Sequence, residues 1–183
     1  MNSDIMRTIL LNSDLKTIEN YCTTNKYNRK LCNNHFWKSK YEYDQYLNLK
    51  DYVEHDVYDA LIEDYDWSYL YSHMTQSIDL IDKIFKLLEN GSFALLSVKM
   101  KFSNEPMPSL IPIKNDYYNK LVLTFNMTAT VDQNNNERIN CLLTINQYDV
   151  YYKTLNISEI ETKNMLILLH FMYSETEIDF KLS

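Results

Sequence analysis

Glycine is almost absent from this chain, which has one glycine in 183 residues. Phosphate-binding loops need several glycines, because the backbone must approach the phosphate at positions without a Cβ atom. This scarcity excludes a Rossmann or P-loop nucleotide-binding fold. The chain also lacks an apolar run of about 18 residues, so a membrane-spanning helix is excluded as well.

Positive charge is also in short supply, since 18 Lys and Arg stand against 25 Asp and Glu and give a net charge of −7. Nucleic acids and anionic membranes attract proteins chiefly through Lys and Arg, so we expect neither as a partner. The N-terminus has only a short apolar run with acids on both sides, which makes a poor signal peptide. These features favour an intracellular, cytoplasmic protein.

Cysteine is rare, and Cys22, Cys32 and Cys141 are odd in number and lack the spacing of metal ligands. In a reducing compartment such cysteines remain free thiols. We therefore expect all three to fill the core and not to form disulfides.

Residues that could carry catalysis or bind a metal are few. His55, Asp59 and Glu63 lie four residues apart on one expected helix face, but a solvated acidic face explains them without a metal. His170 lies in an apolar run and is expected to be a packed residue of the core, not a base. We expect no catalytic residue, no metal and no cofactor.

Residues 1–40 have apolar side chains at helical spacing and predict three short helices. Ser3 is a candidate cap for the first helix, and Ser13 or Asp14 for the second. The first apolar stripe consists of Ile5, Met6, Ile9 and Leu10. The second consists of Leu15, Ile18, Tyr21 and Cys22. Seven Lys and Arg against three acids give this segment a net charge of +4.

Residues 41–91 differ in composition, because residues 41–79 contain ten acids, one lysine and eight of the 16 tyrosines. We expect a strong helix at 75–89, ended by Asn90-Gly91. Trp67, Tyr69 and Tyr71 are the candidate target-binding residues, since aromatic patches are common interaction hot spots. Residues 41–79 have a net charge of −9, which favours a basic partner. The alternative is a solvated linker helix whose tyrosines pack on the following sheet.

Residues 92–183 change to an alternating pattern, which indicates strands. A hairpin is expected at 120–145, a third adjacent strand after it, and a helix at 158–174 that begins with the capping box Ser158–Glu161. The predicted fold class is α+β, with a small antiparallel sheet and a packed C-terminal helix. We expect a helical unit at 1–40, an acidic Tyr-rich helical linker at 41–91 and an α+β target-binding domain at 92–183.

The order of apolar residues in the N-terminal segment resembles an F-box. The first helix of that family begins with Leu-Pro, an acid and an apolar pair, followed by a second apolar pair. Here these are Asp4, Ile5, Met6, Ile9 and Leu10, while Met1 and Asn2 replace Leu-Pro. The second half of the pattern is matched by Leu11, Leu15, Ile18, Cys22, Asn25-Lys26, Leu31-Cys32 and Trp37. The segment TNKYNRKLCNNHFWK looks most like F-box-like proteins of large DNA viruses that infect amoebae.

The resemblance implies that the N-terminal helices dock onto the Skp-type adaptor of a cullin-RING ubiquitin ligase while the rest of the chain holds a target protein. The implied partner-binding residues are Ile5, Met6, Leu10, Leu15 and Trp37. Other subunits transfer ubiquitin, so the chain would be a non-enzymatic adaptor in the host cytoplasm, or carried with the virion. The alternative is a viral structural or virion-associated protein whose helical start serves assembly.

Overall fold

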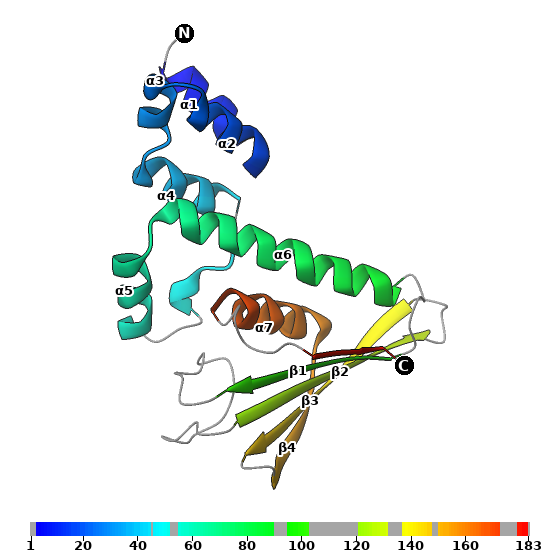
Figure 1. Cartoon of the computed structure of the whole chain (residues 1–183). Coiled ribbons are helices and arrows are strands. Elements are labelled where there is room, and N and C mark those ends of the chain that lie inside the picture. The colour runs from blue at the N-terminus through cyan, green and yellow to red at the C-terminus, as the bar shows by residue number, and fades with distance from the viewer. Residues whose placement is uncertain are drawn as a thin grey trace. The chain divides into compact units, whose positions relative to one another are not determined.

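The chain has an α+β fold, seen in a computed structural model that describes residues 3–44, 46–51, 55–89, 95–102, 121–131, 137–147, 150–172 and 179–182 (Figure 1). It forms two compact units, Met1–Gln76 and Ser77–Ser183, which we call the N-terminal unit and the C-terminal unit. Their boundary lies inside one long helix, whereas the composition predicted boundaries after residues 40 and 91.

The N-terminal unit consists of helices. They are α1 (Ser3–Leu11), α2 (Leu15–Thr24), α3 (Lys26–Leu31), α4 (Asn34–Tyr43), the 3-10 helix η1 (Leu49–Asp51), α5 (His55–Asp64) and the first part of α6 (Trp67–Glu89). Four helices begin within residues 1–40, where the sequence predicted three. The extra break lies at Asn25, whose backbone is extended and whose side chain accepts a hydrogen bond from the Asn28 amide at 2.9 Å. Asn25 therefore ends α2 and caps the N-terminus of a separate helix, α3.

Short polar side chains also cap the neighbouring helices. Asp14 Oδ1 accepts from the Thr17 amide at 2.7 Å at the start of α2, and Asn33 Oδ1 accepts from the Phe36 amide at 2.9 Å at the start of α4. The bond from Thr17 lowers the pKa of the Asp14 carboxyl, because it stabilises the charged form. The prediction that Ser13 or Asp14 begins the second helix is confirmed for Asp14.

The expectation of three free thiols is wrong for two of them, because Cys22 and Cys32 form a disulfide. Cys22 lies on α2 and Cys32 is the residue after α3, and these two helices pack together. Packing brings the two Cα atoms to 5.9 Å, within the usual range for a disulfide. Spacing in the sequence could not show this, because it depends on how α3 folds back on α2. The expectation is confirmed for Cys141, which is free and buried, and burial raises the pKa of its thiol.

We expect the disulfide to stabilise the N-terminal unit by about 2–3 kcal/mol, because it restricts a loop of about ten residues in the unfolded chain. Both tryptophans, Trp37 and Trp67, lie in this unit, so tryptophan fluorescence during urea unfolding reports on it alone. The variant Cys22→Ser plus Cys32→Ser should unfold at lower urea than the oxidised protein. Dithiothreitol should shift the wild type and leave the variant unchanged; an equal midpoint for all samples would contradict the prediction.

The core of the N-terminal unit is rich in aromatic residues. Phe36, Trp37 and Tyr41 of α4 and Tyr71 of α6 are at most 6% exposed. The Trp37 ring contacts the rings of Phe36 and Tyr71 at centroid distances of 5.5 and 5.4 Å. Aliphatic residues complete this core: Leu10, Ile18, Leu49, Leu70 and Met74. Helix α6 therefore begins eight residues before the predicted helix at 75–89, because its apolar stripe already starts at Leu70.

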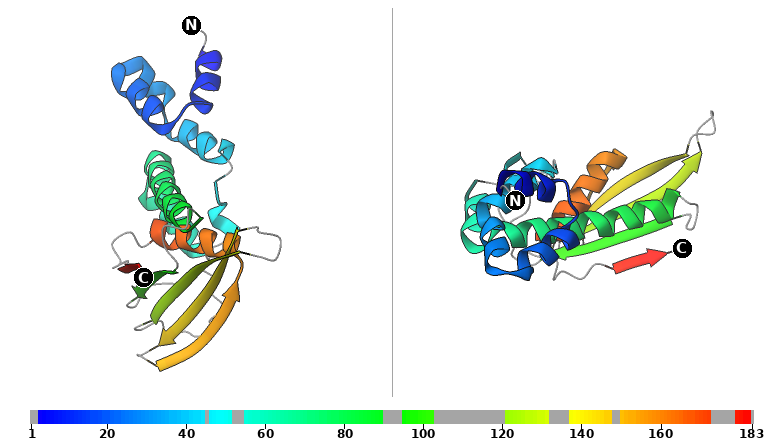
Figure 2. Two further views of the ribbon diagram at one scale, coloured as in Figure 1. Left: turned by 90° about the vertical axis from the view of Figure 1, so that its right-hand side faces the viewer. Right: turned by 90° about the horizontal axis from the view of Figure 1, so that it is seen from above.

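The C-terminal unit is built on one antiparallel sheet with the strand order β4-β3-β2-β1-β5 (Figures 1 and 2). The strands are β1 (Leu95–Phe102), β2 (Leu121–Val131), β3 (Glu137–Gln147), β4 (Val150–Ile157) and β5 (Asp179–Leu182). The predicted hairpin is confirmed, since β2 pairs with β3 from Leu121↔Gln147 to Val131↔Glu137. The predicted third adjacent strand is β4. The fifth strand, β5, lies in a segment where the sequence predicted none.

The two faces of the sheet differ in chemistry, as alternation requires. Side chains that are at most 9% exposed form the inner face: Val98, Leu123, Phe125, Met127, Ile139, Cys141, Leu143 and Ile145. Threonine and asparagine dominate the other face of β2, β3 and β4. Helix α7 (Glu159–Met172) lies against the sheet, and the part of α6 in the same unit lies beyond it (Figure 2).

Helix α7 confirms the predicted C-terminal helix and its capping box. The Glu161 amide donates to Ser158 Oγ at 3.2 Å, and the Ser158 amide donates to Glu161 Oε2 at 2.9 Å. The bonds from Ser158 lower the pKa of the Glu161 carboxyl. Two further links join α7 to α6 within the unit: Ser77 Oγ lies 2.9 Å from His170 Nδ1, and Lys163 Nζ lies 2.6 Å from Asp82 Oδ1.

Candidate protein-binding surface and aromatic cavity

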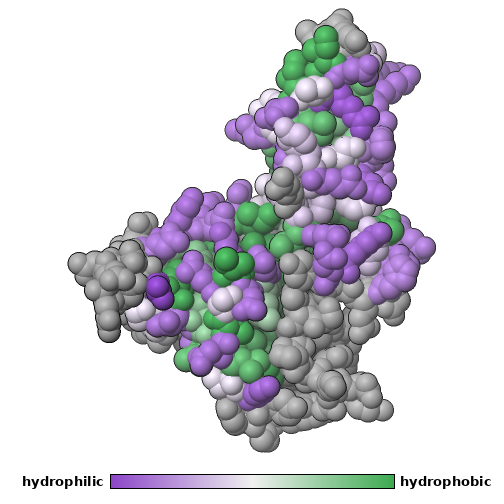
Figure 3. All heavy atoms as spheres, turned by 180° about the vertical axis from the view of Figure 1, so that it is seen from behind, coloured by the Kyte–Doolittle hydropathy of each residue, from purple (hydrophilic) through white to green (hydrophobic). Residues whose placement is uncertain are grey.

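Helix α1 exposes an apolar face. Ile5 is 56% exposed and Ile9 is 51% exposed, and their spacing of four residues places them side by side on the helix. In the space-filling view, hydrophobic side chains reach the surface near the N-terminus among polar ones (Figure 3). Large exposed aliphatic side chains on adjacent turns are typical of surfaces that another protein covers.

The opposite face of α1 is held by its own unit. Leu10 is 2% exposed, Arg7 Nη2 donates to Ser39 Oγ at 2.9 Å, and Lys40 Nζ donates to the Leu11 carbonyl at 2.8 Å. Ser39 and Lys40 belong to α4, so α4 fixes both the position and the C-terminal end of α1. The pair Ile5–Ile9 is therefore presented to solvent by a helix that is anchored from behind.

The five predicted partner-binding residues fall into three groups. Ile5 is exposed, Met6 and Leu15 are half-buried, and Leu10 and Trp37 belong to the core of the N-terminal unit. Sequence reasoning missed Ile9 as a contact residue, although Ile9 shares the helical period of Ile5. Burial separates Ile9 from its neighbour Leu10, and periodicity alone does not say which of two adjacent apolar residues turns inward.

The three predicted target-binding residues do not form one patch. Tyr71 is buried, with its ring stacked on Tyr46 at 5.3 Å. Tyr69 is 49% exposed and stacks between Tyr65 and His73 on another face of the helix. Trp67, which is half-buried, lines a separate cavity. Tyr69 is two residues from both Trp67 and Tyr71, a spacing that turns its side chain to a different face of the helix, whereas Trp67 and Tyr71 are four residues apart and start from the same face.

One predicted partner-binding residue and one predicted target-binding residue do lie together, in a shallow hollow of the surface. Trp37 and Tyr69 both line it, together with Cys22 of the disulfide, and its volume is about 570 Å³. Trp37 shows only 6% of its surface, so it offers little area to a partner there.

A partly buried ionic network joins α4 to α6 within the N-terminal unit. Lys40, only 3% exposed, places Nζ 2.8 Å from Asp44 Oδ1, and the Tyr71 hydroxyl donates to Asp44 Oδ2 at 2.6 Å. Burial, and the hydrogen bond to the Asp44 carboxylate, raise the pKa of Tyr71 above its usual value. Tyr71 is therefore neutral at physiological pH and acts as a donor in this network.

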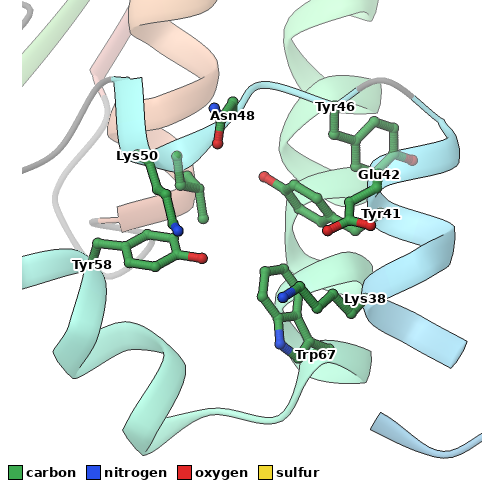
Figure 4. Close-up of a pocket in the computed structure, with 9 residues that line it drawn as sticks. Lys38, Tyr41, Glu42, Tyr46, Asn48, Lys50, Tyr58 and Trp67 are labelled. Carbon is green, nitrogen blue, oxygen red and sulfur yellow. The ribbon is translucent and has the colours of Figure 1, made fainter. Parts of the chain in front are cut away.

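An aromatic cavity of about 400 Å³ opens beside this core (Figure 4). Its walls are the rings of Tyr41, Tyr46, Tyr58 and Trp67, which come from α4, the segment after α4, α5 and α6. Tyr41 contacts both Tyr46 and Trp67 edge to face, at 5.4 and 5.5 Å, and donates its hydroxyl to the Leu47 carbonyl at 2.8 Å. Burial raises the pKa of Tyr41, so its hydroxyl stays protonated.

Charged side chains stand at two sides of this cavity. Lys38 Nζ lies 5.6 Å from the ring centroid of Trp67, and Lys50 Nζ lies 5.0 Å from that of Tyr58. Among the lining residues that the structure describes, Glu42 is the one acid. The close-up shows the Lys50–Tyr58 pair facing the Lys38–Trp67 pair across the opening (Figure 4).

The histidines show no metal site in the part of the chain that the structure describes. His55 Nδ1 lies 3.7 Å from Asp59 Oδ2 on an exposed face of α5. No group of three His, Cys, Asp or Glu side chains among the described residues is placed to hold a metal ion. His170 is half-buried at Ser77.

Comparisons with known proteins gave no match. No protein-family model, no curated protein and no solved structure matches this chain. Across the helices that the structure describes, none combines the length and the apolar character needed to cross a bilayer.

Proposed function

We propose that this chain is a non-enzymatic adaptor. Its N-terminal unit binds a Skp-type adaptor of a cullin-RING ubiquitin ligase in the host cytoplasm, and the remainder of the chain holds a target protein. The observation that carries the proposal is the exposed pair Ile5–Ile9 on a helix that α4 anchors from behind. The F-box-like order of residues 1–40 supplies the identity of the partner.

The physics of such an interface is the burial of apolar side chains against a partner groove. Full burial of an isoleucine contributes about 1.5–3 kcal/mol, and about half of each side chain is still exposed, so covering Ile5 and Ile9 contributes roughly 1.5–3 kcal/mol in total. The half-buried Met6 and Leu15 add contact area beside them. The net charge of +4 on residues 1–40 favours a partner with an acidic rim, which speeds association and selects the partner. No catalytic group is needed, because the proposed adaptor only holds the target protein close to the ubiquitin ligase.

A specific observation favours a second function, that of a virion-associated structural protein. The Cys22–Cys32 disulfide lies within the F-box-like segment, and disulfides persist in virions and other oxidising settings but are rare in the cytosol. In that case the exposed face of α1 would serve assembly with other virion proteins.

The test of the adaptor function is a binding measurement with purified host Skp-type adaptor. The variant Ile5→Asp plus Ile9→Asp should weaken binding at least about 100-fold, because two anchors are lost and two charges would be desolvated at the interface. Its urea unfolding should stay within about 1 kcal/mol of the wild type, since both positions are solvent-exposed. Leu10 is unsuitable for this test because its side chain belongs to the core.

A matched control is Leu142→Asp plus Ile160→Asp. These two apolar residues are 41% and 73% exposed and lie in the C-terminal unit, so this variant should bind the adaptor like the wild type. Absence of binding by the wild type would reject the adaptor function. Equal binding by the Ile5–Ile9 variant and the wild type would reject the surface.

A further inference from the structure

The aromatic cavity of the N-terminal unit has the size of a ligand site. Its volume of about 400 Å³ falls within the roughly 300–1,000 Å³ typical of small-molecule pockets. Leu49, 2% exposed, is among its lining residues, and four aromatic rings form its walls. We propose that this cavity binds a planar aromatic group that carries a negative charge.

The aromatic part of the proposal follows from the walls. Tyr41 is fixed by its hydroxyl bond to the Leu47 carbonyl and by edge-to-face contacts with Tyr46 and Trp67. Rings held in place in this way present their faces and edges without further loss of conformational freedom on binding. A planar ring gains stacking or edge-to-face contacts from such walls, beyond the burial of its apolar area.

The charge of the ligand follows from the two lysines. Lys50 is the only Lys or Arg among residues 41–79, and it lines this cavity. Lys38 stands at the facing wall, and in the described part of the chain neither lysine lies within ion-pair distance of a carboxylate. Among the described lining residues, two ammonium groups stand against the single carboxylate of Glu42, so this part of the lining is cationic within a strongly acidic segment. An anion on the ligand is attracted by both ammonium groups.

An aromatic cage of this kind could in other proteins hold a cation. Here Lys38 and Lys50 already lie over the Trp67 and Tyr58 rings. A second cation would meet these two charges at the same ring faces. The proposal does not depend on the adaptor function, because the cavity and α1 are formed by different residues.

The probe for this site is 2-naphthoate, with 2-naphthamide as its neutral counterpart and tetramethylammonium as the cation. We expect 2-naphthoate to bind with a Kd of about 1 mM, the affinity usual for a fragment of this size. In nuclear magnetic resonance titrations the Trp67 indole Nε1–H signal should move and the Trp37 signal should not. The signals are assigned by the variant Trp67→Leu, which should also bind roughly tenfold more weakly.

The variant Lys38→Met plus Lys50→Met removes both charges and keeps most of the side-chain length. It should weaken binding of 2-naphthoate by about 5–20-fold and leave 2-naphthamide unaffected. The matched control, Lys26→Met plus Lys30→Met, changes two exposed lysines of α3 in the same unit and should bind like the wild type. Loss of binding in both lysine variants alike would show only a general charge effect and would overturn the proposal.

Two sources could supply the ligand chemistry, a free small molecule or an aromatic side chain beside acids in a protein. The peptide acetyl-Asp-Phe-Asp-amide, titrated beside 2-naphthoate, distinguishes them. A tighter Kd for the peptide assigns the site to a protein segment, and a tighter Kd for 2-naphthoate assigns it to a small molecule; both support the chemistry. Equal binding of naphthoate and naphthamide, preference for tetramethylammonium, or no movement of the Trp67 signal up to about 10 mM probe would each overturn it.

Discussion

Replacement of Asp44 by alanine should destabilise the N-terminal unit by about 3–5 kcal/mol, the usual effect of leaving a buried charge, here that of Lys40, without its counter-charge. Lys40 is 3% exposed, and once the Asp44 carboxylate is gone it keeps the Leu11 carbonyl as a hydrogen-bond acceptor and the Tyr43 and Tyr71 rings nearby, but loses its counter-charge. The Tyr71 hydroxyl loses its acceptor at the same time. Because total stabilities are about 5–15 kcal/mol, this single change should bring the unit near the limit of folding.

Urea unfolding followed by tryptophan fluorescence measures this effect, since both tryptophans report on the N-terminal unit. Asp64→Ala is the control, because Asp64 is an exposed acid on α5 and should change the free energy of unfolding by no more than about 0.5 kcal/mol. The double variant Lys40→Met plus Asp44→Ala should regain part of the loss, since no unpaired charge remains. A loss below about 1 kcal/mol in Asp44→Ala, with no recovery in the double variant, would mean that the pair contributes little.

In the C-terminal unit, Phe125→Ala should lower the free energy of unfolding by about 3–5 kcal/mol. Phe125 has no exposed surface and sits on the central strand β2, opposite Val98 of β1 and Leu143 of β3, which are also buried. Removal of the ring leaves a cavity that rigid strands on both sides can fill only in part.

Hydrogen exchange of the β2 and β3 amides measures this change, because these strands exchange only when the sheet opens. Thr124→Ala serves as the control on the same strand: its side chain points to the other face, which is half-exposed, so the change should be within about 1 kcal/mol. Similar exchange rates in the two variants would contradict the view that the inner face of β2 carries the core.

Local features of this protein follow from the sequence because they depend on neighbouring residues. Alternation at 121–131 and 137–147 predicted the hairpin, and the Ser158–Glu161 box predicted the start of α7. Asp14 as a cap is equally local, since its side chain bonds an amide three residues away. The α+β class follows from the change of period along the chain, which a single sequence displays.

Only the tertiary structure decided which apolar residues face solvent and which polar residues are buried. Leu10 and Ile9 are adjacent and equally apolar, yet the packing of α1 on α4 buries one and exposes the other. Lys40 is buried because it meets the carbonyl of Leu11, 29 residues away in the chain.

The disulfide and the aromatic cavity have the same origin. Cys22 and Cys32 meet because α3 folds back on α2, and the cavity forms because α4, η1, α5 and α6 converge. Trp67 and Tyr71 have the same residue class and the same acidic surroundings in the sequence. One lines the cavity and the other lies in the core, since side-chain burial is set by contacts between distant segments that the local pattern does not encode.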